Sequence, residues 1–74
     1  MSQDRDPRTD PRRGDTWRKE FMTGFRSRTV TRVDPVGGSH NVEYVTGNGV
    51  GGRCWSTTWE AWTRGAELLE RGAE

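Results

Sequence analysis

The chain has 74 residues and a net charge of +1, and 28% of its residues are hydrophobic while 31% are charged. This length permits one small domain and excludes a large core. One cysteine, Cys54, excludes an internal disulfide framework and a zinc site of several thiolates. No apolar run approaches the roughly 18 residues of a membrane span, so we expect a soluble, cytoplasmic protein.

The segment 1–14 contains no aromatic or branched aliphatic side chain and holds two of the three prolines. Because such a segment has little to bury against the entropy lost on ordering, it predicts a disordered N-terminal arm. Aromatic, valine and leucine residues begin after this arm. We therefore expect a single small domain over residues 15–74.

The domain opens with one ambiguous segment and one strand. GDTWRKEF, residues 14–21, begins either a strand or a helical turn, and the four-residue spacing of Trp17 and Phe21 favours the turn. RTVTRVD, residues 28–34, has the β-branched content of a strand. The PVGGS that follows predicts a hairpin loop of about five residues.

HNVEYVT, residues 40–46, predicts the second strand of this hairpin, with Val42 and Tyr44 on one face. GNGVGG, residues 47–52, lacks the lysine and the helix start of a phosphate-binding loop, so we interpret it as a hairpin loop. RCWS, residues 53–56, then predicts a third strand.

The last predicted element is a helix over residues 58–71. Thr57 and Glu60 have the spacing of a capping box at its start. An apolar stripe at helical spacing consists of Trp59, Trp62, Ala66 and Leu69. Because large rings dominate burial in a small domain, we expect Trp59 and Trp62 in the core. Trp55 stands on the preceding strand, where it is expected to face outward.

This order of elements predicts an α+β fold, in which a small curled antiparallel sheet of three to four strands carries a C-terminal helix. We favour an SH3-like or partly open barrel. An open three-stranded sheet with the helix across one face is the alternative.

Four segments of the domain carry a resemblance. GDTWRKEF, RTVTRVD, NVEYVTGN and WSTTWEAW together resemble the small proteins encoded by phages and prophages of GC-rich bacteria. The resemblance implies a small accessory protein that binds a partner, in the cytoplasm of a bacterium or of a phage's host cell. It supplies no catalytic residue.

Catalysis and metal binding are not expected from this residue inventory. An enzyme needs a nucleophile, a base and a charge stabiliser that converge on one pocket. The chain has one histidine, His40, and one thiol, Cys54, which we interpret as an exposed side chain and a small buried one. We predict no catalytic residue, no metal site and no cofactor.

A protein-binding module is the function that the sequence favours. Tryptophan and arginine are enriched among interface hot spots, and this chain is rich in both. Such a module would bind or inhibit a larger host or viral protein. The alternation of strand residues selects as candidate partner-binding residues Trp17, Arg28, Arg32 and Trp55.

The alternative function is a small barrel that binds DNA or RNA through the arginine-rich half of the chain. Residues 1–28 carry eight basic and five acidic side chains, whereas residues 29–74 carry four and six. The candidate phosphate contacts are Arg5, Arg8, Arg12, Arg13 and Arg26. Aspartates interleaved with these arginines reduce the field and weigh against this alternative.

Overall fold

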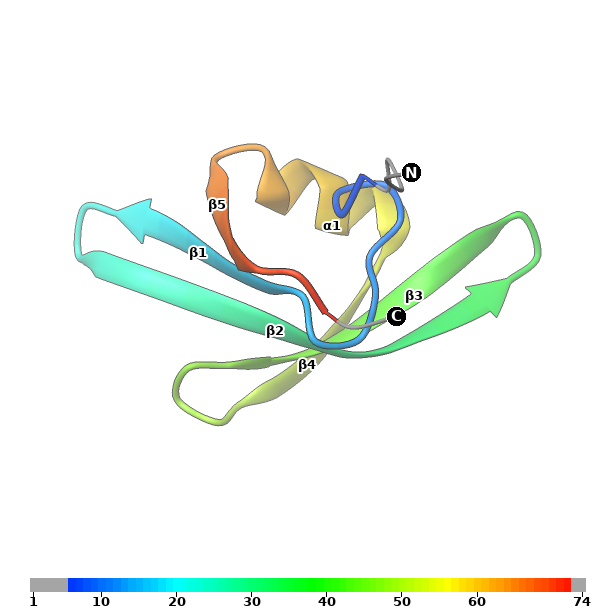
Figure 1. Cartoon of the computed structure of the whole chain (residues 1–74), viewed down its shortest axis with the longest axis horizontal. Helices are drawn as coiled ribbons and strands as arrows, with labels where there is room; N and C mark the ends of the chain where they lie inside the picture. The colour runs from blue at the N-terminus through cyan, green and yellow to red at the C-terminus, as the bar shows by residue number, and fades with distance from the viewer. Residues whose placement is uncertain (1–5, 73–74) are drawn as a thin grey trace.

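The computed structural model describes residues 6–72, which form one antiparallel sheet and one helix (Figure 1). The elements in chain order are β1 (Thr16–Phe21), β2 (Gly24–Val36), β3 (Ser39–Thr46), β4 (Gly51–Trp55), α1 (Ser56–Thr63) and β5 (Ala66–Glu70). The strand order in the sheet is β4-β3-β2-β1-β5. The predicted α+β fold with an antiparallel sheet is confirmed, but the sheet has five strands and is open. Within the described residues, no helix is long and apolar enough to cross a membrane.

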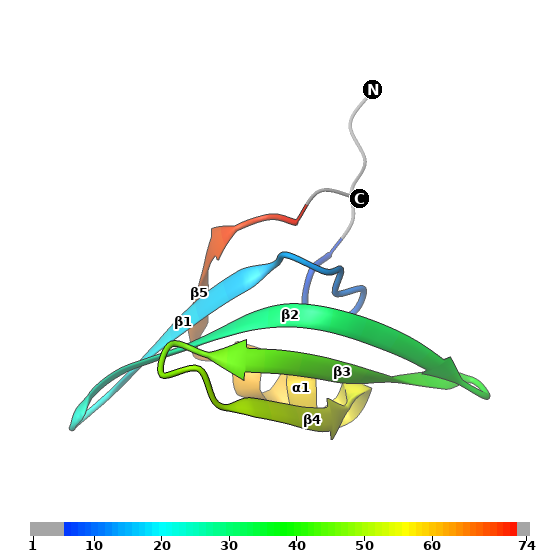
Figure 2. The same ribbon diagram turned by 90° about the horizontal axis from the view of Figure 1, so that it is seen from below.

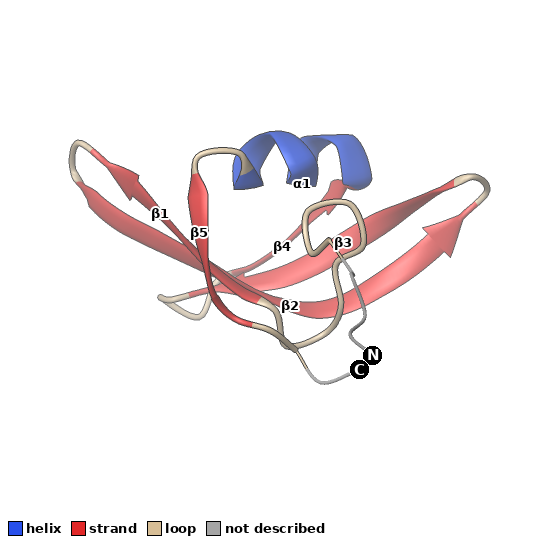
Figure 3. Ribbon diagram, turned by 45° about the horizontal axis from the view of Figure 1, so that its top comes forward, coloured by secondary structure: helices blue, strands red, loops and turns tan. Residues whose placement is uncertain are grey.

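β2 is the longest strand, and its two halves pair with different neighbours. Residues 24–29 pair with β1, and residues 28–36 pair with β3. A β-bulge at residues 30–32 interrupts the second pairing, and bulges increase the local twist of a strand. The sheet curls around α1, which lies on its concave side (Figures 1 and 3). The β1–β2 hairpin extends beyond the helix at one end of the sheet (Figure 2).

The core lies between α1 and the concave face of the sheet. Its fully buried apolar side chains are Trp17, Val30, Val42 and Trp59, and the partly buried ones packed against them are Val33, Tyr44, Cys54, Trp62, Ala66 and Leu68. Every strand of the sheet contributes at least one of these residues. The prediction that Val42 and Tyr44 share one face of their strand is confirmed, and the structure shows that this face is the inner one.

The predicted helix over residues 58–71 is wrong in its second half. α1 ends at Thr63, and residues 66–70 form β5, which pairs with β1. As a strand, this segment packs Ala66 and Leu68 against the core, whereas Leu69 of the predicted helical stripe is 51% exposed. The segment pairs with β1 despite its helical propensity. This pairing gives hydrogen bonds to the edge of β1 that would otherwise be open.

The predicted start of the helix also requires correction. The residue preceding α1 is Trp55, and no side chain caps the helix. Thr57 and Glu60 therefore do not form the predicted capping box. Ser56, the first helical residue, instead shares a hydrogen bond of 2.7 Å with Ser39 of β3. This contact ties the first turn of α1 to the sheet.

Two further local predictions are decided by strand pairing. Residues 16–21 form a strand, so the helical turn favoured for GDTWRKEF is wrong, and Trp17 and Phe21 are related by strand alternation. The loop of the β2–β3 hairpin contains two residues, Gly37 and Gly38, in place of about five. Gly37 has φ of 61°, a conformation that favours glycine at the first position of such a tight turn.

The segment predicted as a disordered arm is partly described. Residues 1–5 lie outside the described residues, and residues 6–14 have a defined position beside the core. Their backbone turns at Asp6, whose carbonyl accepts hydrogen bonds from two amides, at 2.7 and 3.1 Å. Pro11 is buried, so a proline ring here contributes to packing.

Candidate binding groove

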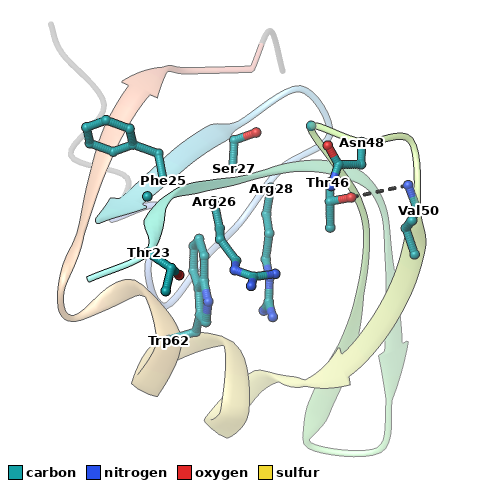
Figure 4. Close-up of a pocket in the computed structure, with 11 residues that line it drawn as sticks. Thr23, Phe25, Arg26, Ser27, Arg28, Thr46, Asn48, Val50 and Trp62 are labelled. Atoms are coloured by element: carbon teal, nitrogen blue, oxygen red, sulfur yellow. Dashed lines mark hydrogen bonds between the residues drawn. The ribbon is translucent and has the colours of Figure 1, made fainter. Parts of the chain in front are cut away.

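A groove lies on the concave side of the sheet, beside the part of β2 that has no β3 neighbour (Figure 4). Its walls are residues 23–28, residues 46–48 and Val50, and Trp62 of α1 lies against it. The cavity volume is about 460 Å³. None of these lining residues has a carboxylate, whereas Arg26 and Arg28 both enter from β2. We call this site the basic groove.

Arg28 is held in the basic groove between two aromatic rings. Its guanidinium carbon lies 4.2 Å from the ring centre of Tyr44 and 4.3 Å from that of Trp62. The sheet register places Arg28 on the concave face, because it pairs with the buried Trp17 of β1. A guanidinium over an aromatic face is attracted by the ring quadrupole. These two contacts orient the cation at the boundary between core and groove.

Arg26 is the more accessible cation of the groove. It pairs with Lys19 across β1 and β2 and lies 5.7 Å from the ring centre of Phe21. Lys19 donates a 3.0 Å hydrogen bond to the carbonyl of Trp62 at the end of α1. In the part of the chain that the structure describes, Arg26 and Arg28 form no ion pair. Their positive charge therefore faces the groove without an internal counterion.

The tryptophans of α1 divide between core and groove. Trp59 is completely buried, as predicted. Trp62 is half-buried, with its ring centre 5.9 Å from that of Trp59 on one side and near the guanidinium of Arg28 on the other. The position of Trp62 at the groove was not predicted. Helical spacing shows which side chains face the sheet, but it does not show where the sheet beneath the helix ends.

The predicted partner-binding residues do not converge on one surface. Trp17 is 2% exposed, so its assignment to a partner surface is wrong: strand alternation in β1 turns this ring into the core. Arg28 lies in the basic groove. Arg32 donates a 2.7 Å hydrogen bond to Asp34 and points to the convex face. Trp55 is 49% exposed on that same convex face.

The predicted nucleic-acid contacts do not form a continuous row either. Arg5 lies outside the described residues. Arg8 stacks 5.2 Å from the ring centre of Trp17 and donates to the carbonyl of Thr63 at 3.3 Å. Arg12 forms an ion pair of 3.3 Å with Asp10. Arg13 is exposed outside the groove, and Arg26 lies in it.

Comparison of the chain with protein-family models, with curated proteins and with solved structures gave no match. The site is therefore interpreted from the geometry of this chain. Two arginines without carboxylate partners, the aromatic rings beside them and the polar side chains of Thr23, Thr46 and Asn48 are suited to an anionic ligand that also presents an apolar surface.

Cys54 and His40 lie on the concave side of the sheet and do not line the basic groove. Cys54 pairs with Val42, two residues along β3 from His40. Burial raises the pKa of the Cys54 thiol, and the positive charge of Arg28 opposes this shift more weakly. A thiol that stays protonated is a poor nucleophile. Within residues 6–72, no group of three or more His, Cys, Asp or Glu side chains could hold a metal ion.

The raised pKa of Cys54 predicts slow alkylation and a loss of stability at high pH. The folded thiol keeps its proton above pH 9.0, its ordinary pKa, where the thiol of the unfolded chain has already ionised. The free energy of unfolding should therefore fall as the pH rises above this value. Iodoacetamide should also alkylate the native chain more slowly than the urea-unfolded chain at the same pH. Equal rates in both states would contradict this account of the thiol, and a Cys54→Ser variant provides the control for the stability measurement.

Proposed function

We propose that this protein is a non-enzymatic binding module that holds an acidic segment of a partner protein in the basic groove. The observation that carries the proposal is the pair Arg26 and Arg28, which line one cavity with no carboxylate among its lining residues. Burying part of a cation without a counterion is unfavourable, so a ligand that supplies carboxylates would stabilise this arrangement. The aromatic rings beside both arginines restrict their rotamers and lower the entropy lost on binding.

A protein partner is favoured over nucleic acid by the positions of the other arginines. Arg8 and Arg12 are engaged within the chain, at Thr63 and Asp10. The net charge of the chain is only +1, whereas a protein that follows a phosphate backbone needs a continuous basic surface. A single nucleic-acid strand is the second candidate, because two arginines without a carboxylate beside them line the basic groove and could contact phosphates.

The proposal extends to the kind of fold and the biological role. The strand order β4-β3-β2-β1-β5, a long β2 shared between two halves of the sheet and a helix before the last strand are similar to the arrangement of an SH3-like barrel that has not closed. Small barrels of this kind often bind segments of other proteins. We propose a small accessory protein of the phage type that acts on a larger host or viral protein.

Reversing the charge of Arg26 tests the proposed function. The probe is a fluorescein-labelled glutamate-rich peptide, and binding is measured by fluorescence anisotropy. Arg26→Glu should weaken binding about tenfold or more, because it replaces an attraction by a repulsion in the groove. Arg32→Glu makes the same change in net charge on the convex face, where Arg32 is bonded to Asp34, and should leave the affinity nearly unchanged.

The same assay with an oligothymidine probe compares the two ligand classes. Preference for oligothymidine, with a steep loss of affinity as salt rises, would favour nucleic acid and contradict the protein-binding proposal. Equal effects of Arg26→Glu and Arg32→Glu would show that overall charge, rather than the basic groove, determines binding.

A further inference from the structure

One wall of the basic groove is formed by the start of β2, where β3 no longer runs beside this strand. Val30 donates its N–H to the carbonyl of Asp15 and accepts from the N–H of Gly14, at 2.9 and 2.8 Å, so its backbone polar groups face β1. In an antiparallel sheet these groups alternate between the two edges of a strand. The backbone groups of Phe25 and Ser27 therefore point away from β1, those of Ser27 toward Gly47 and those of Phe25 into the groove.

β3 ends before it reaches this edge. Its last residue, Thr46, bonds instead across its own hairpin, accepting from Gly49 at 2.9 Å and donating to Val50 at 2.8 Å. The loop of this hairpin covers Ser27, since a Cβ on Gly47 would lie 2.8 Å from Ser27 Oγ, but among the described residues it makes no backbone hydrogen bond to Phe25. A strand that continued the path of β3 along β2, beyond this loop, would satisfy the backbone groups of Phe25.

We propose that the partner's acidic segment binds as an added strand, antiparallel to residues 24–26 of β2, and this proposal rests on the function proposed above. Paired residues of an antiparallel ladder share a face. The segment's residue opposite Arg26 thus lies on the concave side, where a carboxylate meets the guanidinium. Its neighbour opposite Phe25 lies on the convex side, against a ring that is 60% exposed. The ligand is therefore a segment that alternates acidic and apolar residues.

Charge distinguishes this edge from the outer edge of β5. That edge carries Glu67 and Glu70, which repel an acidic segment. The edge of residues 24–26, by contrast, lies beside the side chains of Arg26 and Arg28 and faces the cavity of about 460 Å³. Figure 4 shows both arginine side chains on the helix side of β2, and Phe25 turned to the other side.

N-methylation of a probe peptide tests the added strand directly. The probe is a synthetic peptide of alternating glutamate and valine. In the proposed register the valine amides bond to Phe25 and the glutamate amides point away from β2. A peptide N-methylated at its valines should bind about tenfold more weakly, which corresponds to the loss of one or two hydrogen bonds. The matched peptide N-methylated at its glutamates should bind within about twofold of the parent.

The outcomes separate this proposal from the one it rests on. If the parent peptide binds, Arg26→Glu weakens it, and both methylated peptides bind as well as the parent, the basic groove is correct and the added strand is wrong. Equal weakening by both methylation patterns would also overturn the strand register. If neither the parent peptide nor a polyglutamate probe binds the wild-type chain, the proposed function fails and the added strand fails with it.

Discussion

Replacing Trp59 by alanine should lower the free energy of unfolding by about 3–5 kcal/mol, the usual cost of removing a large buried ring. Trp59 is fully buried, stacks on Trp62 and packs against the tilted ring of Tyr44, with ring centres 5.9 and 6.0 Å away. Within residues 6–72 its Nε1 has no hydrogen-bond partner, so packing accounts for its contribution. Small domains have a total stability of about 5–15 kcal/mol, and most of a marginal one would be lost.

Urea unfolding followed by circular dichroism measures this change. Trp55→Ala is the matched control, since Trp55 is 49% exposed on the convex face, and it should cost less than about 1 kcal/mol. Where Trp59→Ala is too unstable to fit, Trp59→Phe should show an intermediate loss with a native-like spectrum. Equal destabilisation by Trp55→Ala and Trp59→Ala would contradict the assignment of Trp59 to the core.

The arrangement of WSTTWEAW was largely predictable because it depends on local periodicity. Trp59 and Trp62 are three residues apart, and helical spacing directs both toward the sheet. The exposure of Trp55 follows from its place on β4, where the neighbouring Cys54 turns inward. Periodicity could not predict that Trp59 is fully buried whereas Trp62 is only half-buried. This difference depends on where the sheet beneath the two rings ends.

β5 was missed because its stability comes from a distant partner. AELLE has strong helical propensity and continues the apolar spacing of α1. It becomes a strand by pairing with β1, about fifty residues earlier in the sequence, and single-sequence patterns carry little information about such pairing. The sequence signal that could have indicated the change is Gly65, which lies between α1 and β5 and disfavours a continuous helix.

The candidate site could be predicted only in part for the same reason. Arg28 and Arg26 were both selected, but for different ligands and different surfaces. Trp17 was selected for an outward face by strand alternation, but the register of β1 turns its ring into the core. The basic groove itself results from unequal pairing of β2, which depends on two hairpin lengths and a bulge. None of these is fixed by composition or by local alternation.

Asp15→Ala should destabilise the protein by about 2–4 kcal/mol, because it removes an acceptor that joins the two ends of the described chain. The buried carboxylate accepts from the N–H of Arg12 at 2.9 Å through Oδ2 and from the N–H of Gly72 at 2.7 Å through Oδ1. Hydrogen bonds to a charged group contribute about 1.5–3 kcal/mol each, and buried donors left without an acceptor add to the loss. A side chain on Gly72 would collide with the carbonyl of Arg13, so the fit at this junction is close.

Amide hydrogen exchange distinguishes this junction from a general loss of stability. In Asp15→Ala the amides of Arg12 and Gly72 should exchange much faster than those of the core strands β2 and β3, because their acceptor is lost while the sheet pairing is kept. Asp10→Ala is the control: Asp10 is exposed and pairs with Arg12 at the surface, where ion pairs contribute about 0–1 kcal/mol. Unchanged exchange at Gly72 in Asp15→Ala would mean that the last described residues are held by other contacts. Faster exchange at both amides, with β2 and β3 protected, would establish that the Asp15 carboxylate holds residues 6–14 and the segment after β5 against the sheet through these two hydrogen bonds.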